Sequence, residues 1–98
     1  MLLTIDCGNT NTVFAVFSAG EKRGSWRAST NVARTADEYA VWLTQLMALE
    51  GIDRSDIGDV IMATVVPEVV FNLETLCRKY FNTEPMIVGR KGVDLGID

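Results

Sequence analysis

Two apolar runs flank a short polar stretch in the first part of the chain, and this arrangement constrains the fold more than any other feature. Residues 1–5 form the first run and residues 13–17 the second, and six of the seven residues between them are small or polar. Glycine and asparagine tolerate the positive φ that tight hairpins need. The pattern therefore predicts two strands joined by a turn at residues 6–12.

The polar stretch also carries groups that can bind a phosphate. A carboxylate, two amides, two hydroxyls and a glycine gather at one strand end, in the residues Asp6, Gly8, Asn9, Thr10, Asn11 and Thr12. A phosphate can approach a glycine closely, and hydroxyls and backbone N–H groups can donate to its oxygens. The Asp6 carboxylate would repel a bare phosphate, so it fits beside one only with a Mg²⁺ between them.

The same residue types are common in ordinary hairpins, so composition alone leaves a phosphate site and a plain turn equally open. The stretch matches neither of the two commonest phosphate-binding motifs. It lacks the Gly-Lys-Ser/Thr of a Walker A loop and the Gly-x-Gly-x-x-Gly of a dinucleotide-binding fold.

A third strand and a first helix are predicted next. Residues 18–24 form a polar turn, and residues 25–29 follow as a short strand in which Trp26 is expected to pack in the core. Thr35 and Glu38 have the spacing of a capping box, which begins a helix that ends before Gly51. One apolar stripe runs along this helix and is expected to cover the sheet: Tyr39, Trp42, Leu43, Leu46 and Met47.

The second half of the chain alternates strand and helix. Residues 60–66 are almost unbroken in their apolar character, which is typical of a strand covered on both faces. Pro67 fits the first turn of a second helix with its own apolar face, and residues 86–88 predict a last short strand. The order is βββαβαβ, with parallel strands joined by right-handed crossovers. This pattern alone indicates an α/β fold.

Two further residues have two interpretations each. The hydroxyl of Thr64 could line a ligand cleft at the end of its strand, or it could bond locally to the backbone. Arg34 is a lone cation before the helix cap, expected to be solvated, with a phosphate or carboxylate contact as the alternative.

Composition excludes several function classes. The net charge is −4 and no basic cluster is present, which argues against nucleic acid or an anionic membrane as a partner. The absence of histidine removes the usual general base. Cys7 and Cys77 fit no metal-binding spacing and suit a cytoplasmic protein with reduced thiols. No apolar segment approaches the ~20 residues of a membrane-spanning helix.

Three stretches resemble a known family, the type III pantothenate kinases. Met-Leu-Leu-Thr-Ile-Asp-x-Gly-Asn-Thr-Asn-Thr-Val-Phe, at residues 1–14, is similar to the opening of these enzymes. Ala-Thr-Val-Val-Pro at residues 63–67 and the sequence of residues 92–98 give supporting matches. The family is part of the acetate kinase/sugar kinase/Hsp70/actin superfamily.

The resemblance implies a fold and an activity. The fold would be a ribonuclease H-like βββαβαβ domain with a mixed five-stranded sheet, one half of an actin-like ATPase. Residues 1–98 would form the single N-terminal domain of a two-domain kinase. This kinase would phosphorylate pantothenate with ATP, the first step of coenzyme A synthesis, using Mg²⁺ and a monovalent cation (K⁺ or NH₄⁺). It would be a cytoplasmic homodimer.

The resemblance also implies roles for individual residues. Asp6 would organise the Mg²⁺, Gly8 would allow close approach of the backbone, and Asn9, Thr10, Asn11 and Thr12 would bind the ATP phosphates. None of them is a catalytic base; the resemblance places the family's base in a Gly-x-Asp-Arg segment that would follow residue 98. The isolated chain is therefore expected to be inactive. Two alternatives remain: another phosphotransferase of the superfamily, or a non-catalytic α/β interaction domain.

Overall fold

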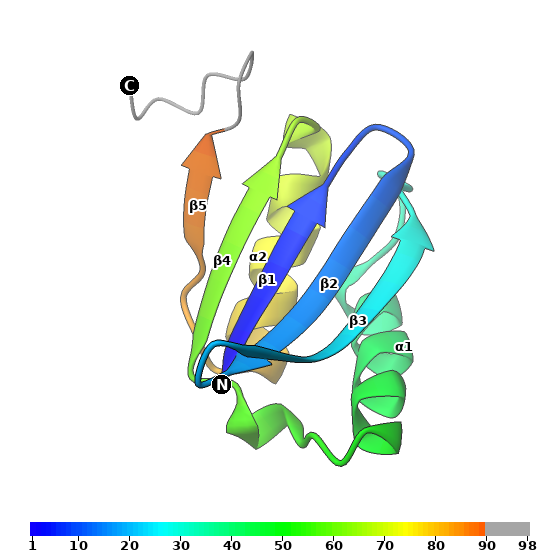
Figure 1. Cartoon of the computed structure of the whole chain (residues 1–98). Coiled ribbons are helices and arrows are strands. Elements are labelled where there is room, and N and C mark those ends of the chain that lie inside the picture. The colour runs from blue at the N-terminus through cyan, green and yellow to red at the C-terminus, as the bar shows by residue number, and fades with distance from the viewer. Residues whose placement is uncertain (90–98) are drawn as a thin grey trace.

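The computed structural model describes residues 1–89 as one mixed sheet with two α-helices against it (Figure 1). The strands are β1 (Leu2–Cys7), β2 (Asn11–Ser18), β3 (Glu21–Ser29), β4 (Asp59–Thr64) and β5 (Met86–Gly89), and the α-helices are α1 (Ala36–Leu49) and α2 (Val70–Tyr80). Two short 3-10 helices span Arg54–Asp56 and Pro67–Val69. The strand order in the sheet is β3-β2-β1-β4-β5. The predicted βββαβαβ order is confirmed.

Strand β1 lies at the centre of the sheet and has a different kind of neighbour on each side. It pairs antiparallel with β2, with Cys7 opposite Thr12, and parallel with β4, with Cys7 beside Thr64. Strands β1, β3, β4 and β5 therefore end at the same edge of the sheet, which also carries the β1–β2 loop (Figure 1). This is the edge at which open α/β sheets place their ligands.

The turn between β2 and β3 is tighter than predicted. Strand β3 begins at Glu21, so the polar residues 21–24, assigned above to a turn, belong to a strand. Ala19 and Gly20 both have positive φ, 52° and 82°, which matches the twist of a two-residue hairpin turn. The positive φ expected for the first hairpin occurs in this second one instead.

Helix α1 follows its sequence signals closely. The Thr35 hydroxyl accepts from the Glu38 N–H, and the Glu38 carboxylate accepts from the Thr35 N–H at 2.8 Å, so the capping box is confirmed. Gly51, just past the helix end, has a φ of +73°, which glycine adopts without strain. The stripe packs on the sheet, where the Trp42 ring meets the Phe14 ring edge-on at 5.6 Å.

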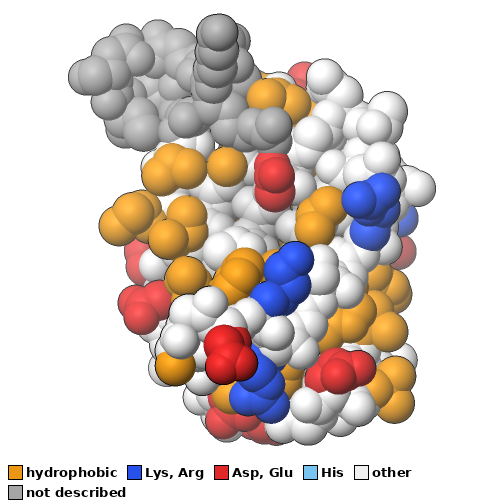
Figure 2. Space-filling model, viewed as in Figure 1, with side chains coloured by type: hydrophobic (Ala, Val, Ile, Leu, Met, Phe, Trp, Pro, Cys, Tyr) orange, Lys and Arg blue, Asp and Glu red, His pale blue; other side chains and the backbone are white. Residues whose placement is uncertain are grey.

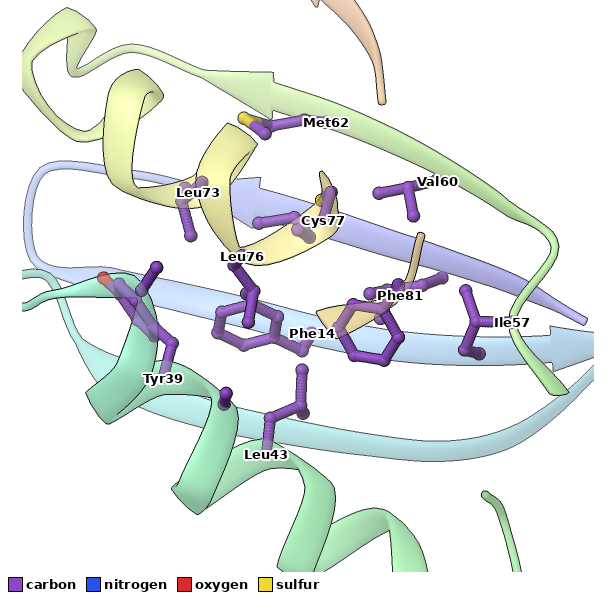
Figure 3. Packing of buried hydrophobic residues seen from close by; sticks show 14 of the residues in the cluster. Phe14, Tyr39, Leu43, Ile57, Val60, Met62, Leu73, Leu76, Cys77 and Phe81 are labelled. Carbon is purple, nitrogen blue, oxygen red and sulfur yellow. The ribbon is translucent and has the colours of Figure 1, made fainter. Parts of the chain in front are cut away.

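Helix α2 covers the same face of the sheet as α1. Pro67 occupies the first position of the 3-10 helix that leads into α2, as predicted. The core between the helices and the sheet contains the buried side chains drawn in Figure 3, among them Phe14, Tyr39, Leu43, Met62, Leu73 and Leu76. Trp26 is half-buried and packs against this cluster, which confirms its predicted packing role. Neither α1 nor α2, the α-helices of residues 1–89, is long and apolar enough to cross a membrane.

The opposite face of the sheet differs from the prediction. Residues 60–66 were expected to form a strand covered on both faces, but in residues 1–89 both α-helices lie on one side. Burial in β4 consequently alternates: Val60 and Met62 are buried, whereas Ile61 and Ala63 are only partly covered. Figure 2 shows hydrophobic side chains on this open face, interspersed with charged ones.

Candidate functional site

The β1–β2 loop holds the predicted site residues at the edge where β1 and β4 end (Figure 1). The strands reach further into the polar stretch than predicted, because Asp6 still belongs to β1 and both Asn11 and Thr12 belong to β2. Gly8, Asn9 and Thr10 alone form the loop. The Gly8 N–H donates to the carbonyl of Asn11 at 2.9 Å and closes it.

Four of the predicted site residues are exposed: Asp6, Asn9, Thr10 and Asn11. Asp6 lies between Ile5 and Cys7, which are buried under the helices, so its carboxylate projects from the open face. The backbone N–H groups of Asn9 and Thr10 donate to no acceptor within residues 1–89. Within the described part of the chain, the loop therefore presents two N–H donors without an acceptor, together with amide and hydroxyl side chains, at this edge.

Thr12 is placed differently from the other five residues. Its side chain is fully buried, and its Oγ1 lies 2.9 Å from Thr30 Oγ1 and 3.2 Å from the sulfur of Cys7. Alternation along β2 turns this hydroxyl toward the helices. The side chain of Thr12 thus supports the loop from beneath, and direct donation from it to a phosphate does not fit this burial.

Gly8 does not have the positive φ that the sequence suggested for this turn. A Cβ built on Gly8 would lie 3.4 Å from the Asn11 carbonyl oxygen, which is ordinary contact. The closing bond from Gly8 to Asn11 is made without left-handed backbone, so the turn itself does not require glycine. A requirement for glycine would have to come from something outside residues 1–89 that approaches the loop.

Thr30 is a residue of the site that the sequence analysis missed. Thr30 follows β3 directly. Its Oγ1 donates to the Gly8 carbonyl at 2.7 Å, and its N–H donates to the Thr10 carbonyl at 2.9 Å. No local motif marks this threonine. Its position next to the loop follows only from the β3-β2-β1 arrangement, which places the end of β3 beside the start of β2.

The contacts of Thr64 support the interpretation in which its hydroxyl bonds locally to the backbone. Its side chain is fully buried, its Oγ1 accepts from the Val66 N–H at 2.8 Å, and it lies 3.2 Å from the Val66 carbonyl. These bonds shape the turn from β4 into the helix that begins at Pro67.

Arg34 and Tyr39 form a second polar group near the same edge. Arg34 is half-buried: its Nη1 donates to the Ser29 carbonyl at 2.7 Å, and its guanidinium lies 5.5 Å from the centre of the Tyr39 ring. The expected solvated cation is therefore held against the protein. The buried Tyr39 hydroxyl has no hydrogen-bond partner within residues 1–89, and burial raises its pKa above the usual value.

The donor set fits one kind of metal. Within the described part of the chain, no three His, Cys, Asp or Glu side chains gather closely enough to enclose a metal ion. Asp6 nevertheless offers one exposed carboxylate next to N–H donors. Mg²⁺ is commonly bound by one or two carboxylates, with phosphate oxygens and water completing its shell. The residues present fit a Mg²⁺ that arrives with a phosphate ligand.

Comparison with known proteins supports the fold and shows the family. A crystal structure described as that of an N-acetylglucosamine kinase from Porphyromonas gingivalis matches the fold with a TM-score of 0.61 and 19% identity, over 91% of this chain and 34% of that one. The chain therefore shares its α/β fold class, with a mixed five-stranded sheet, with this sugar kinase. The family model for type III pantothenate kinase matches residues 2–98, and the chain belongs to that family.

Curated relatives support the family assignment. The type III pantothenate kinases of Paramagnetospirillum magneticum and Rhodospirillum rubrum are 61% and 62% identical to this chain over 97 residues, and that of Maricaulis maris is 52% identical over 98. The chain spans 37–38% of the length of these relatives. Residues 92–98, the third stretch of resemblance, lie outside the described residues.

Proposed function

We propose that residues 1–98 are the N-terminal, phosphate-binding domain of a kinase that transfers the γ-phosphoryl group of ATP to pantothenate, opening coenzyme A synthesis. The observation that carries this proposal is the β1–β2 loop. In a chain of this family, it presents at the ligand-binding edge of the sheet the N–H groups of Asn9 and Thr10, which have no acceptor within residues 1–89.

The chain's own residues would position and stabilise the ATP phosphates. Asn9, Thr10 and Asn11 would donate from exposed side chains and from the loop backbone, and Gly8 would let a phosphate oxygen approach that backbone. Thr12 would act from beneath, through its contact with Thr30. Phosphoryl transfer depends largely on such positioning and on stabilising charge, because the protein itself does little covalent chemistry.

Asp6 would hold the Mg²⁺ that accompanies ATP, directly or through water. When bound, this ion neutralises charge that develops on the transferring phosphoryl group. Asp6 suits the role because it is exposed on the open face beside the loop. The monovalent cation implied by the family resemblance, K⁺ or NH₄⁺, is part of the proposal, and we assign no residue of this chain to it.

The pantothenate site and the catalytic base would lie outside residues 1–98, because the family resemblance places the Gly-x-Asp-Arg segment that carries the base after them. We therefore expect no pantothenate-dependent turnover from the isolated chain. The family resemblance supports a cytoplasmic homodimer as the working form.

Isothermal titration of the complete kinase tests the proposal. We expect saturable binding of ATP with Mg²⁺, binding of pantothenate, and ADP release in a coupled assay only when both substrates are present. Binding of ATP without pantothenate would indicate a different phosphotransferase of the superfamily. Binding of neither would indicate an interaction domain whose hairpin is structural.

A further inference from the structure

The geometry points to Thr30 as a positioning residue that aims a backbone N–H group of the β1–β2 loop at the ATP phosphates. This inference rests on the proposed function, because it takes the ATP phosphates to bind at the loop whose geometry Thr30 fixes. Thr30 would touch neither ATP nor the metal.

Thr30 holds the loop at two points. Its hydroxyl donates to the Gly8 carbonyl at 2.7 Å and its N–H donates to the Thr10 carbonyl at 2.9 Å. The two anchored carbonyls bracket Asn9, the central residue of the loop. Both bonds come from the end of β3, a strand that does not pair with β1.

The bond to Gly8 determines where the Asn9 N–H points. The carbonyl of Gly8 and the N–H of Asn9 belong to one peptide group, and none of the peptide bonds described is cis. In a planar trans peptide these two groups point in opposite directions. Because Thr30 draws the Gly8 carbonyl toward the protein, the Asn9 N–H faces outward, where it has no acceptor within residues 1–89.

A second hydroxyl supports Thr30 from below. A carbonyl oxygen only accepts, so the proton of Thr30 points to Gly8; Thr30 Oγ1 also lies 2.9 Å from the hydroxyl of Thr12, which in turn lies 3.2 Å from the Cys7 sulfur. Thr12 is fully buried, and the contact between the two hydroxyls is partly buried. The series of polar contacts from Thr12 through Thr30 to the Gly8 carbonyl thus ends at the peptide group that carries the Asn9 N–H.

Two substitutions of Thr30 in the complete kinase test the inference. Thr30→Val keeps the shape and the N–H but removes the hydroxyl, whereas Thr30→Ser keeps the hydroxyl. With the Gly8 carbonyl released, we expect Thr30→Val to raise the Kd for ATP with Mg²⁺ about tenfold, the effect of one lost hydrogen bond to a well-placed group. Thr30→Ser should stay within about threefold of the wild type, and the KM for pantothenate should not change in either variant.

Thr44→Val is the matched control. In the wild type, the Thr44 hydroxyl also donates to a backbone carbonyl, that of Ala40 at 2.6 Å, but this bond lies within α1 and away from the loop. The substitution should leave the Kd for ATP unchanged. A loss of ATP affinity as large as that in Thr30→Val would show that any missing threonine hydroxyl has this effect, and would overturn the inference.

The remaining outcomes are also decisive. An unchanged Kd in Thr30→Val, or an equal loss in Thr30→Ser, would overturn the role of the Thr30 hydroxyl while leaving the proposed function intact. Absence of ATP binding by the wild type would instead overturn the proposed function. If Thr30→Val fails to fold, Thr30→Ala removes the same hydroxyl with a smaller side chain, and an unchanged Kd there would contradict the inference.

Discussion

Replacement of Gly8 by alanine separates the structural and the ligand-binding explanations of the loop. The backbone of Gly8 is outside the left-handed region, and the new Cβ would lie 3.4 Å from the Asn11 carbonyl oxygen. Gly→Ala at a compatible position stabilises a protein by about 0.4–1 kcal/mol. We therefore expect the free energy of unfolding to change by no more than about 1 kcal/mol, and the Tm of the complete kinase by less than about 4 °C.

ATP binding should respond very differently to the same methyl group. A phosphate oxygen bonded to a backbone N–H lies about 2.9 Å from the nitrogen, whereas a methyl carbon keeps other heavy atoms at about 3.5–4 Å. The methyl would displace the phosphate and cost at least one charge-assisted hydrogen bond, about 1.5–3 kcal/mol, or about 10- to 150-fold in Kd.

Calorimetric melting and titration with ATP and Mg²⁺ measure the two effects on the complete kinase. Gly58→Ala is the control, since Gly58 lacks positive φ and a Cβ there meets nothing within 4 Å. Wild-type ATP affinity in Gly8→Ala would refute the close approach of a phosphate. A loss of stability well above 1 kcal/mol would show that the turn itself needs glycine.

Three further predictions concern the metal, the core and the helix cap. Asp6→Asn in the complete kinase should lower kcat at least about 100-fold, because it removes charge that holds Mg²⁺; near-normal turnover in steady-state kinetics would contradict this role. Leu43→Ala, at a fully buried site, should lower the free energy of unfolding by about 2–5 kcal/mol in urea titrations followed by tryptophan fluorescence. The exposed control Leu49→Ala should change it by less than about 0.5 kcal/mol. The backbone and side-chain bonds with Thr35 lower the pKa of Glu38, so its contribution to stability is present above the unfolded pKa, about 4.3, and lost as the pH falls through the lower folded value. Glu38→Gln should therefore flatten the loss of stability below about pH 4.3, and an unchanged acid limb would contradict the capping box.

The features that sequence analysis predicted well are those encoded within a few residues. The capping box of Thr35 and Glu38 and the buried face of α1 depend on spacing along one helix, and both were confirmed. The family resemblance could be seen in the sequence because the hairpin motif is contiguous, and the match of the family model confirmed it.

The features that escaped prediction depend on how distant segments meet. Thr12 looked like one more polar turn residue, but the pairing of Cys7 with Thr12 extends both strands and turns its hydroxyl inward. Thr30 carried no signal at all, since its contact with Gly8 requires the folded sheet. Positive φ was assigned to the first hairpin from its composition, whereas the tighter turn at Ala19 and Gly20 requires it.

The central position of β1 has a consequence for how the domain assembles. Its antiparallel neighbour β2 follows at once along the chain, whereas its parallel neighbour β4 arrives only after β3 and α1. Closing a short loop costs less entropy than closing a long one, and distant pairings slow folding. The three-stranded meander, with Thr30 already against the loop, can therefore form early, even while later residues are still being synthesised. The β1–β4 pairing would then be the slow step, and the phosphate-binding loop would be shaped before the sheet is complete.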